Sequence, residues 1–191
     1  MLGFTAARIL LVLHTALGVS AVAAGTHLVI WLRRYLRGAA GRRRSVLKFA
    51  WIFFALQLCA FGAGNLMYPT YRVEVRSAYL ENAAAVSAQA DLHSNAVATL
   101  EARSGQTREA PATVDLVRRA AKAARWFDVK EHWIALGLFV SAALLLVLSM
   151  WDPDRDGMAL APIAMGFAVL AAGTVWLGAI IGVLTAAWRA V

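Results

Sequence analysis

The sequence is poor in cysteine and in charge. It has one cysteine, Cys59, in 191 residues, and only 16% of its residues are charged. One cysteine excludes an internal disulfide and any metal site built from several cysteines. Soluble domains are about 25% charged and about 45–50% apolar, whereas 61% of this chain is hydrophobic. The composition therefore excludes a disordered chain and an ordinary soluble enzyme, and it indicates an integral membrane protein.

Familiar catalytic motifs are also missing. The chain has no glycine-rich phosphate loop, no H-E-x-x-H zinc motif and no G-x-S-x-G nucleophile motif. The long apolar runs contain no Asp or Glu, which disfavours a transporter that relays protons between carboxylates. Residues 152–157 read D-x-D-x-D-G, but the twelfth position of that would-be calcium loop is Ile163 instead of glutamate. We therefore expect a turn and a helix cap there.

Four long apolar runs dominate what is present. Residues 9–32, 49–67, 133–151 and 158–188 carry no formal charge. A helix rises about 1.5 Å per residue and a bilayer core is about 30 Å thick, so roughly 20 residues span it. The sequence predicts an all-α polytopic membrane protein, with 1–191 forming one membrane domain. Its four transmembrane helices, 9–32, 47–68, 130–151 and 159–188, are expected to form an up-down bundle.

The basic residues predict the orientation of these helices. The connection 33–48 carries seven Lys and Arg residues and no acid, which places it in the cytoplasm of a bacterial-type inner membrane by the positive-inside rule. Both termini and residues 69–131 are then periplasmic or extracellular.

The connection between the second and third spans is too long for a structureless loop. Residues 77–103 have no glycine or proline and favour helix. Ser104-Gly105 is a stop signal, and Pro111 or Thr113 is expected to restart a helix that runs straight into the third span. The alternating pattern of 71–76 predicts a short extended segment. Residues 69–128 thus form an outer helical cap, whose nearly balanced charge argues against nucleic acid.

Two histidines suggest a specific function. His14 lies about 7 Å below the outer end of the first span, and His132 opens the third span from the same side. Two imidazoles at one level are what axial ligation of haem b requires. Arg72 and Arg76 are then candidates to pair with haem propionates, and Tyr68 is a candidate hydrogen-bond donor. Glycines are expected to leave room for the flat ring: Gly18, Gly62, Gly64, Gly137, Gly178 and Gly182. The roles of His27 and His93 stay open.

Other functions remain open beside a haem-binding electron-transfer subunit. One alternative is a non-catalytic accessory or assembly subunit of a larger membrane complex. A third alternative is a quinone or small-ligand site built from Tyr68, Arg72 and Trp133. Gly178 and Gly182 form a small-xxx-small pattern that favours close helix packing within the chain and, as an alternative, a homo-oligomer.

The outer boundary holds the least generic segments, 65–72 and 126–133. They mix aromatic, proline and charged residues. We expect them to meet, with Arg72 or Arg76 pairing with Asp128 or Glu131. Interfacial anchoring with an ion pair is the simpler interpretation of such a meeting, and a catalytic cluster is the more specific one.

Overall fold

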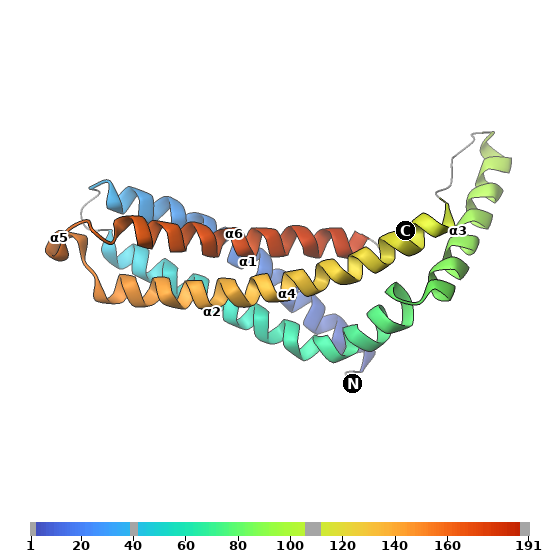
Figure 1. Ribbon diagram of the computed structural model, residues 1–191, viewed down its shortest axis with the longest axis horizontal. Coiled ribbons are helices and arrows are strands. Elements are labelled where there is room, and N and C mark those ends of the chain that lie inside the picture. Colours follow the sequence, from blue (N-terminus) through green and yellow to red (C-terminus); the bar gives the residue numbers. More distant parts are fainter. Residues whose placement is uncertain (1–2, 39–41, 106–111, 188–191) are drawn as a thin grey trace.

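The computed structural model describes residues 3–38, 42–105 and 112–187, and over these residues it contains helices and no strand (Figure 1). Four helical stretches are long and apolar enough to cross a membrane, which agrees with the spans expected from the sequence. In chain order the elements are α1 (Phe4–Leu36), α2 (Arg43–Thr70), the π-helix η1 (Tyr71–Leu80), α3 (Ala83–Ser104), α4 (Thr113–Met150), the short α5 (Pro153–Asp156) and α6 (Ala161–Ala187).

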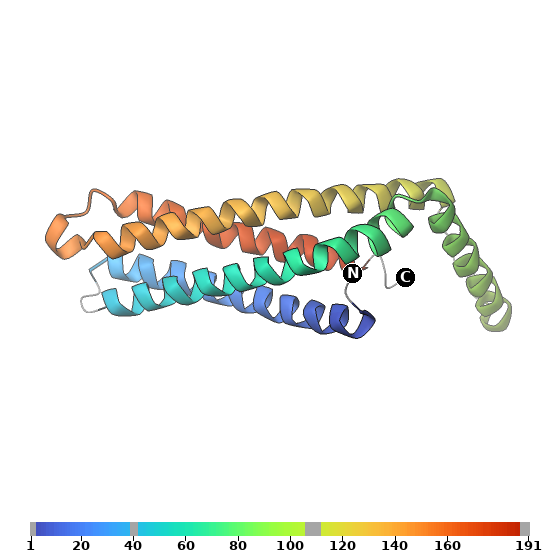
Figure 2. The same ribbon diagram turned by 90° about the horizontal axis from the view of Figure 1, so that it is seen from below.

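The four long helices α1, α2, α4 and α6 lie side by side as a bundle (Figures 1 and 2). Each packs against two neighbours: α1 contacts α2 and α6, and α4 contacts α2 and α6. The end of α1, the start of α2 and α5 lie together at one end of the bundle, which we call the basic end because Arg33, Arg34, Arg43 and Arg44 are there. We call the opposite end, from which α3 projects, the arm end.

Small residues hold the helices together. In α6 the buried face is made largely of alanines spaced three and four apart, including Ala164, Ala168 and Ala171. Such residues let helix backbones approach closely. Gly25 of α1 serves the same purpose, because a Cβ built on it would lie 2.7 Å from Cε2 of the buried Phe53 ring. The bundle core is therefore shaped by close backbone contact and a few large side chains.

The segment 71–76 is helical, so the extended conformation expected from its alternation is wrong. The chain continues from α2 through Pro69 into η1 without a break. Proline has no N–H to donate and crowds the preceding turn, and a π-helix replaces the usual i→i−4 hydrogen bonds by i→i−5 bonds, as between Glu81 N and Arg76 O. Six residues of alternating pattern are too few to impose an extended conformation on a segment that continues the helix of α2.

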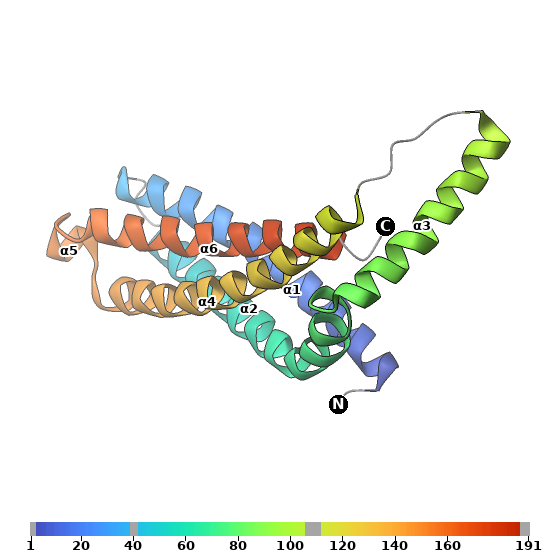
Figure 3. The same cartoon turned by 45° about the vertical axis from the view of Figure 1, so that its right-hand side comes forward.

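The long connection forms an arm that projects from the bundle, as all three ribbon views show (Figures 1–3). Asn82 starts α3 by accepting a hydrogen bond from Ala85 N, and Gly105, with φ +67°, ends it at the predicted stop. The base of the arm is fixed by one apolar cluster of Leu80, Val86, Ala120, Ala123 and Ala124. As expected, α4 begins at Thr113 and continues unbroken through the third candidate span.

Candidate functional site

At the arm end, all four helices of the bundle contribute to one layer of residues: His14 of α1, Gly64 of α2, Lys130 of α4 and Gly182 of α6. A Cβ built on Gly64 would lie 3.2 Å from His14 Cε1, and one built on Gly182 would lie 3.3 Å from Lys130 Nζ. His14 and Lys130 belong to α1 and α4, which both pack against α2 and α6. We call these four residues the arm-end layer.

Lys130 enters this layer because of its position along α4. It precedes Ile134, Gly137 and Ser141 at intervals of three and four residues, and Gly137 and Ser141 are buried against neighbouring helices. Its ammonium lies 5.6 Å from the centre of the Phe127 ring, a cation–π contact. Among the described residues the ion pairs are made by Arg43 and Arg76, and none is made by Lys130.

The two histidines predicted to bind haem lie in different surroundings. His14 is half-buried, and its Nδ1 donates a hydrogen bond to the Ala60 carbonyl oxygen of α2 at 2.9 Å. His132 is exposed on the outward face of α4 that also carries Phe139, and its Nδ1 donates to Asp128 O, one turn earlier, at 2.8 Å. The arm-end layer therefore joins His14 to Lys130, and His132 stands outside it. The exposed His27 likewise bonds its own helix, through Ala23 O.

The glycines expected beside a flat ring are mostly covered by side chains of this chain. Besides Gly64 and Gly182, Gly137 is approached by the Thr174 side chain, and Gly178 is approached by the Ile134 side chain. Only Gly18 and Gly62 of the six have nothing near their Cβ positions. The Gly178 and Gly182 pattern thus faces α4 within the same chain.

Arg76 joins η1 to α4 at the base of the arm. Its guanidinium donates to Asp128 Oδ1 at 2.6 Å and to Glu81 Oε1 at 2.8 Å. These two carboxylates raise the pKa of Arg76 further above its ordinary value. The expected pairing of Arg76 with Asp128 is confirmed. Arg72, the other candidate, is exposed.

Aromatic rings from η1 and α4 stack on each other in the same region. Tyr71 stacks on Phe127 with 3.9 Å between ring centres and 19° between planes, and Tyr68 lies 6.5 Å from Tyr71. Burial raises the pKa of the Tyr71 phenol to about 12. The adjacent Thr70 is buried, and its hydroxyl has no hydrogen-bond partner within the described chain. Trp133, proposed with Tyr68 and Arg72 as a ligand site, is exposed.

A second polar layer lies deeper in the bundle. Gln57 of α2 is 2% exposed, and Ser141 of α4 donates to its Oε1 at 2.5 Å. Gln57 Nε2 is buried and has no partner in the part of the chain that the structure describes. The hydroxyl of Thr174 in α6 donates a hydrogen bond to Ala171 O of the same helix. Polar residues of this kind hold membrane helices in register.

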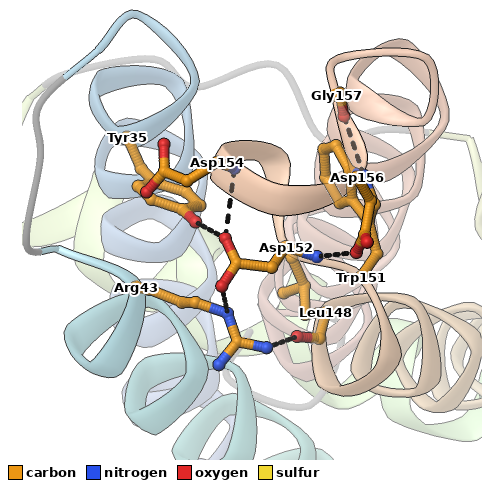
Figure 4. Close-up of polar contacts among 8 residues, drawn as sticks. All are labelled: Tyr35, Arg43, Leu148, Trp151, Asp152, Asp154, Asp156 and Gly157. Atoms are coloured by element: carbon orange, nitrogen blue, oxygen red, sulfur yellow. Dashed lines mark hydrogen bonds and ion pairs between the residues drawn. The ribbon is translucent and has the colours of Figure 1, made fainter.

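The basic end is held by a clasp around Asp152, which begins α5 (Figure 4). Its carboxylate lies 3.4 Å from Arg43 Nε of α2 and accepts a hydrogen bond from the Tyr35 hydroxyl of α1 at 3.4 Å. Asp152 also caps α5 by accepting from Asp154 N, and Arg43 donates to Leu148 O of α4. The turn and cap predicted for 152–157 are present, and they link both helical hairpins.

Within the residues described, no group of three or more His, Cys, Asp or Glu side chains is placed to hold a metal ion. No protein-family model, curated protein or solved structure matches the chain. The main site residue that the sequence reasoning missed is Lys130. Its signal was available, because helical spacing from Ser141 and Gly137 back to position 130 marks the inward face of α4, whereas position 132 falls on the outward face.

Proposed function

We propose that the chain crosses a bacterial-type inner membrane four times, as an up-down bundle with its basic end in the cytoplasm and its arm outside. The seven basic residues of 33–48 support this orientation, and the apolar surface of the bundle supports its location in a membrane. The test uses Cys59→Ser as background, with Ser45→Cys or Ser94→Cys added. A membrane-impermeant maleimide should label position 94, but not position 45, on intact spheroplasts. The reverse pattern would contradict the orientation.

We further propose that the protein is a non-catalytic subunit of a larger membrane complex and that α3 is its contact surface. One observation carries this proposal: large aliphatic side chains are exposed on the arm, which projects away from the bundle (Figures 1–3). Leu92 is 71% exposed and Leu100 is 61% exposed. Val86 is the one buried residue of α3.

Burying the exposed apolar side chains of such an arm against a partner would lower the free energy of the protein. An isolated helix is marginal in water, and most helical stability in proteins comes from packing an apolar face. Burying one leucine side chain stabilises by about 1.5–3 kcal/mol, so burial of Leu92 and Leu100 offers a substantial gain. Between Ala83 and Ser104 the arm carries only three charged residues, Asp91, Glu101 and Arg103, which suits an apolar protein surface and disfavours nucleic acid.

The experiment compares assembly size in mild detergent after extraction from the host membrane. The wild-type chain should migrate with a mass above that of its own detergent-bound form, and a photo-crosslinker at position 92 should join it to a discrete membrane protein. Leu92→Glu with Leu100→Glu should release the chain, whereas Val73→Glu, an exposed position of η1, should not. An unchanged mass in the arm variant would overturn the proposal.

Haem b ligation by His14 and His132 is a second candidate. A specific feature favours it: both imidazoles donate Nδ1–H to backbone carbonyls, which leaves Nε2 available, as in most metal-ligating histidines. Set against this feature, His132 lies on the exposed face of α4, and His27 makes the same kind of bond to its own helix. Axial ligation would therefore require His132 to face inward when haem is present.

A reduced-minus-oxidised visible spectrum of protein purified with added haem decides this candidate. Ligation predicts a haem b band that disappears in His14→Ala and in His132→Ala and persists in His27→Ala. Protein that stays colourless, or a band that survives both substitutions, would remove the haem function and leave the accessory function untouched.

A further inference from the structure

Lys130 makes no ion pair within 4 Å among the described residues, and the Glu131 carboxylate acts on it from a longer distance. Its nearest acidic neighbours in the sequence are Asp128, which pairs with Arg76, and Glu131. No carboxylate of the described residues lies within 4 Å of its ammonium, because the ion pairs found are those of Arg43 and Arg76. A partly buried charge is costly unless it is paired. An anion that reaches this ammonium from the bilayer would complete the pair.

The Lys130 ammonium lies beside Gly182 of α6. Gly182 has no side chain, and a Cβ there would come within 3.3 Å of Lys130 Nζ. The Phe127 ring lies on the other side at 5.6 Å, so the ammonium is supported by an aromatic face and backbone. The imidazole of His14 adds no negative charge, because its Nδ1–H is already donated to Ala60 O.

The depth and the neighbours of Lys130 indicate the kind of anion. Position 130 is one turn before the apolar stretch of α4, where lipid head groups meet the hydrocarbon region in a spanning helix. The residues next in sequence to His14 and Gly182, Leu13 and Val183, are exposed aliphatic side chains at about the same level of the bundle. An anion with acyl chains would satisfy both the ammonium and these side chains. A lysine binds phosphate as a point charge.

We propose that the arm-end layer binds the phosphate group of an anionic phospholipid, with the Lys130 ammonium as the charged contact and Leu13 and Val183 beside the acyl chains. This site is independent of the arm contact proposed above, and it holds whether or not α3 has a partner.

The test measures lipids that stay bound to the full chain. Protein purified from nanodiscs of phosphatidylglycerol and phosphatidylcholine is released into the gas phase, and the bound phosphatidylglycerol is counted by native mass spectrometry. Lys130→Gln should weaken retention about fivefold or more, as expected for loss of one cation near a lipid surface. The matched control Lys122→Gln, which removes an exposed lysine of the same helix, should retain the wild-type amount.

Two further variants separate binding from folding. Lys130→Arg keeps the charge and should keep most of the bound lipid, whereas Gly182→Val fills the space at Nζ without changing the charge and should lose it. All variants are compared at equal helicity by circular dichroism. Equal phosphatidylglycerol retention by wild type and Lys130→Gln would overturn the site. Displacement of the lipid by millimolar inorganic phosphate would overturn the lipid assignment, because it would show a site for free phosphate.

Discussion

The bundle and the arm expose similar apolar side chains but differ in what lies behind them. Phe139 on the bundle is 76% exposed, and Leu92 on the arm is 71% exposed. Behind Phe139 stands a four-helix core with buried alanines and leucines, whereas α3 has only the small cluster at its base. The bundle thus has a packed core of its own, whereas the arm has none beyond its base. An equally exposed side chain therefore lies over a packed core in the bundle and over no core along most of the arm.

The sharpest test of this comparison removes one leucine from each region. Leu144→Ala, in the bundle core, should lower the free energy of unfolding by about 2–5 kcal/mol, because it leaves a cavity where a fully packed side chain stood. Leu92→Ala should change it by no more than about 0.5 kcal/mol. Unfolding in mixed micelles of increasing SDS measures both. Equal losses would show that the arm is packed like the bundle.

A second test adds volume to the bundle. Gly137→Val would place its side chain onto Thr174 of α6, and overpacking of this kind costs about 1–3 kcal/mol. Gly173→Val makes the same change in α6 at a position with no neighbouring atoms within 4 Å. The SDS concentration at the midpoint of unfolding should be much lower for Gly137→Val than for Gly173→Val. A common midpoint would mean that α4 and α6 do not approach at Gly137.

A third test acts at the border between the two regions. Arg76→Gln removes the contacts to Asp128 and Glu81 that join η1 to α4. Because these side chains are partly exposed, we expect a loss of about 1 kcal/mol, confined to the arm. Hydrogen exchange should speed up at residues 83–90 and stay unchanged at 141–148. Arg72→Gln, at an exposed arginine of η1, is the control, and faster exchange throughout the bundle would contradict a local role.

The smallest effect concerns the Tyr71 phenol, which lies beyond the apolar stretch of α2. Its pKa is raised by burial to about 12, from about 10 in the unfolded chain. The neutral phenol therefore contributes its full stability below pH 10, and that contribution is lost as pH rises toward 12. The difference in absorbance between wild type and Tyr71→Phe during alkaline titration should report this ionisation. A transition centred near pH 10 would show an unburied ring.

Much of the bundle could be predicted from the sequence, because lipid demands long uncharged helices and leaves them as plain runs. The stop at Gly105, the helix from Thr113 into the third span and the turn at Asp152 were also predictable, since each has a local signal. The helical conformation of 71–76 was not predictable. Its short alternating pattern favours an extended segment, whereas the helix that continues from α2 favours a helical one. Tertiary contacts such as the stacking of Tyr71 on Phe127 decide between these two conformations.

The site was only partly predictable, for a geometric reason. Depth along a helix follows from counting residues, and it places His14 and His132 at similar levels. The direction of a side chain depends on the 100° rotation per residue, and this rotation sends Lys130 inward and His132 outward. The pairing of Arg76 with Asp128 followed from charge and location. The contact of His14 with Ala60 could not be predicted, since it depends on which face of α1 meets α2.

The clasp at Asp152 bears on the order in which the protein is built. Tyr35 and Arg43 belong to the hairpin that leaves the ribosome first, and Asp152 belongs to the hairpin that follows. Tyr35 and Arg43 therefore lack this carboxylate until the second hairpin has been synthesised. A chain truncated before residue 152 would lack this link between its two hairpins.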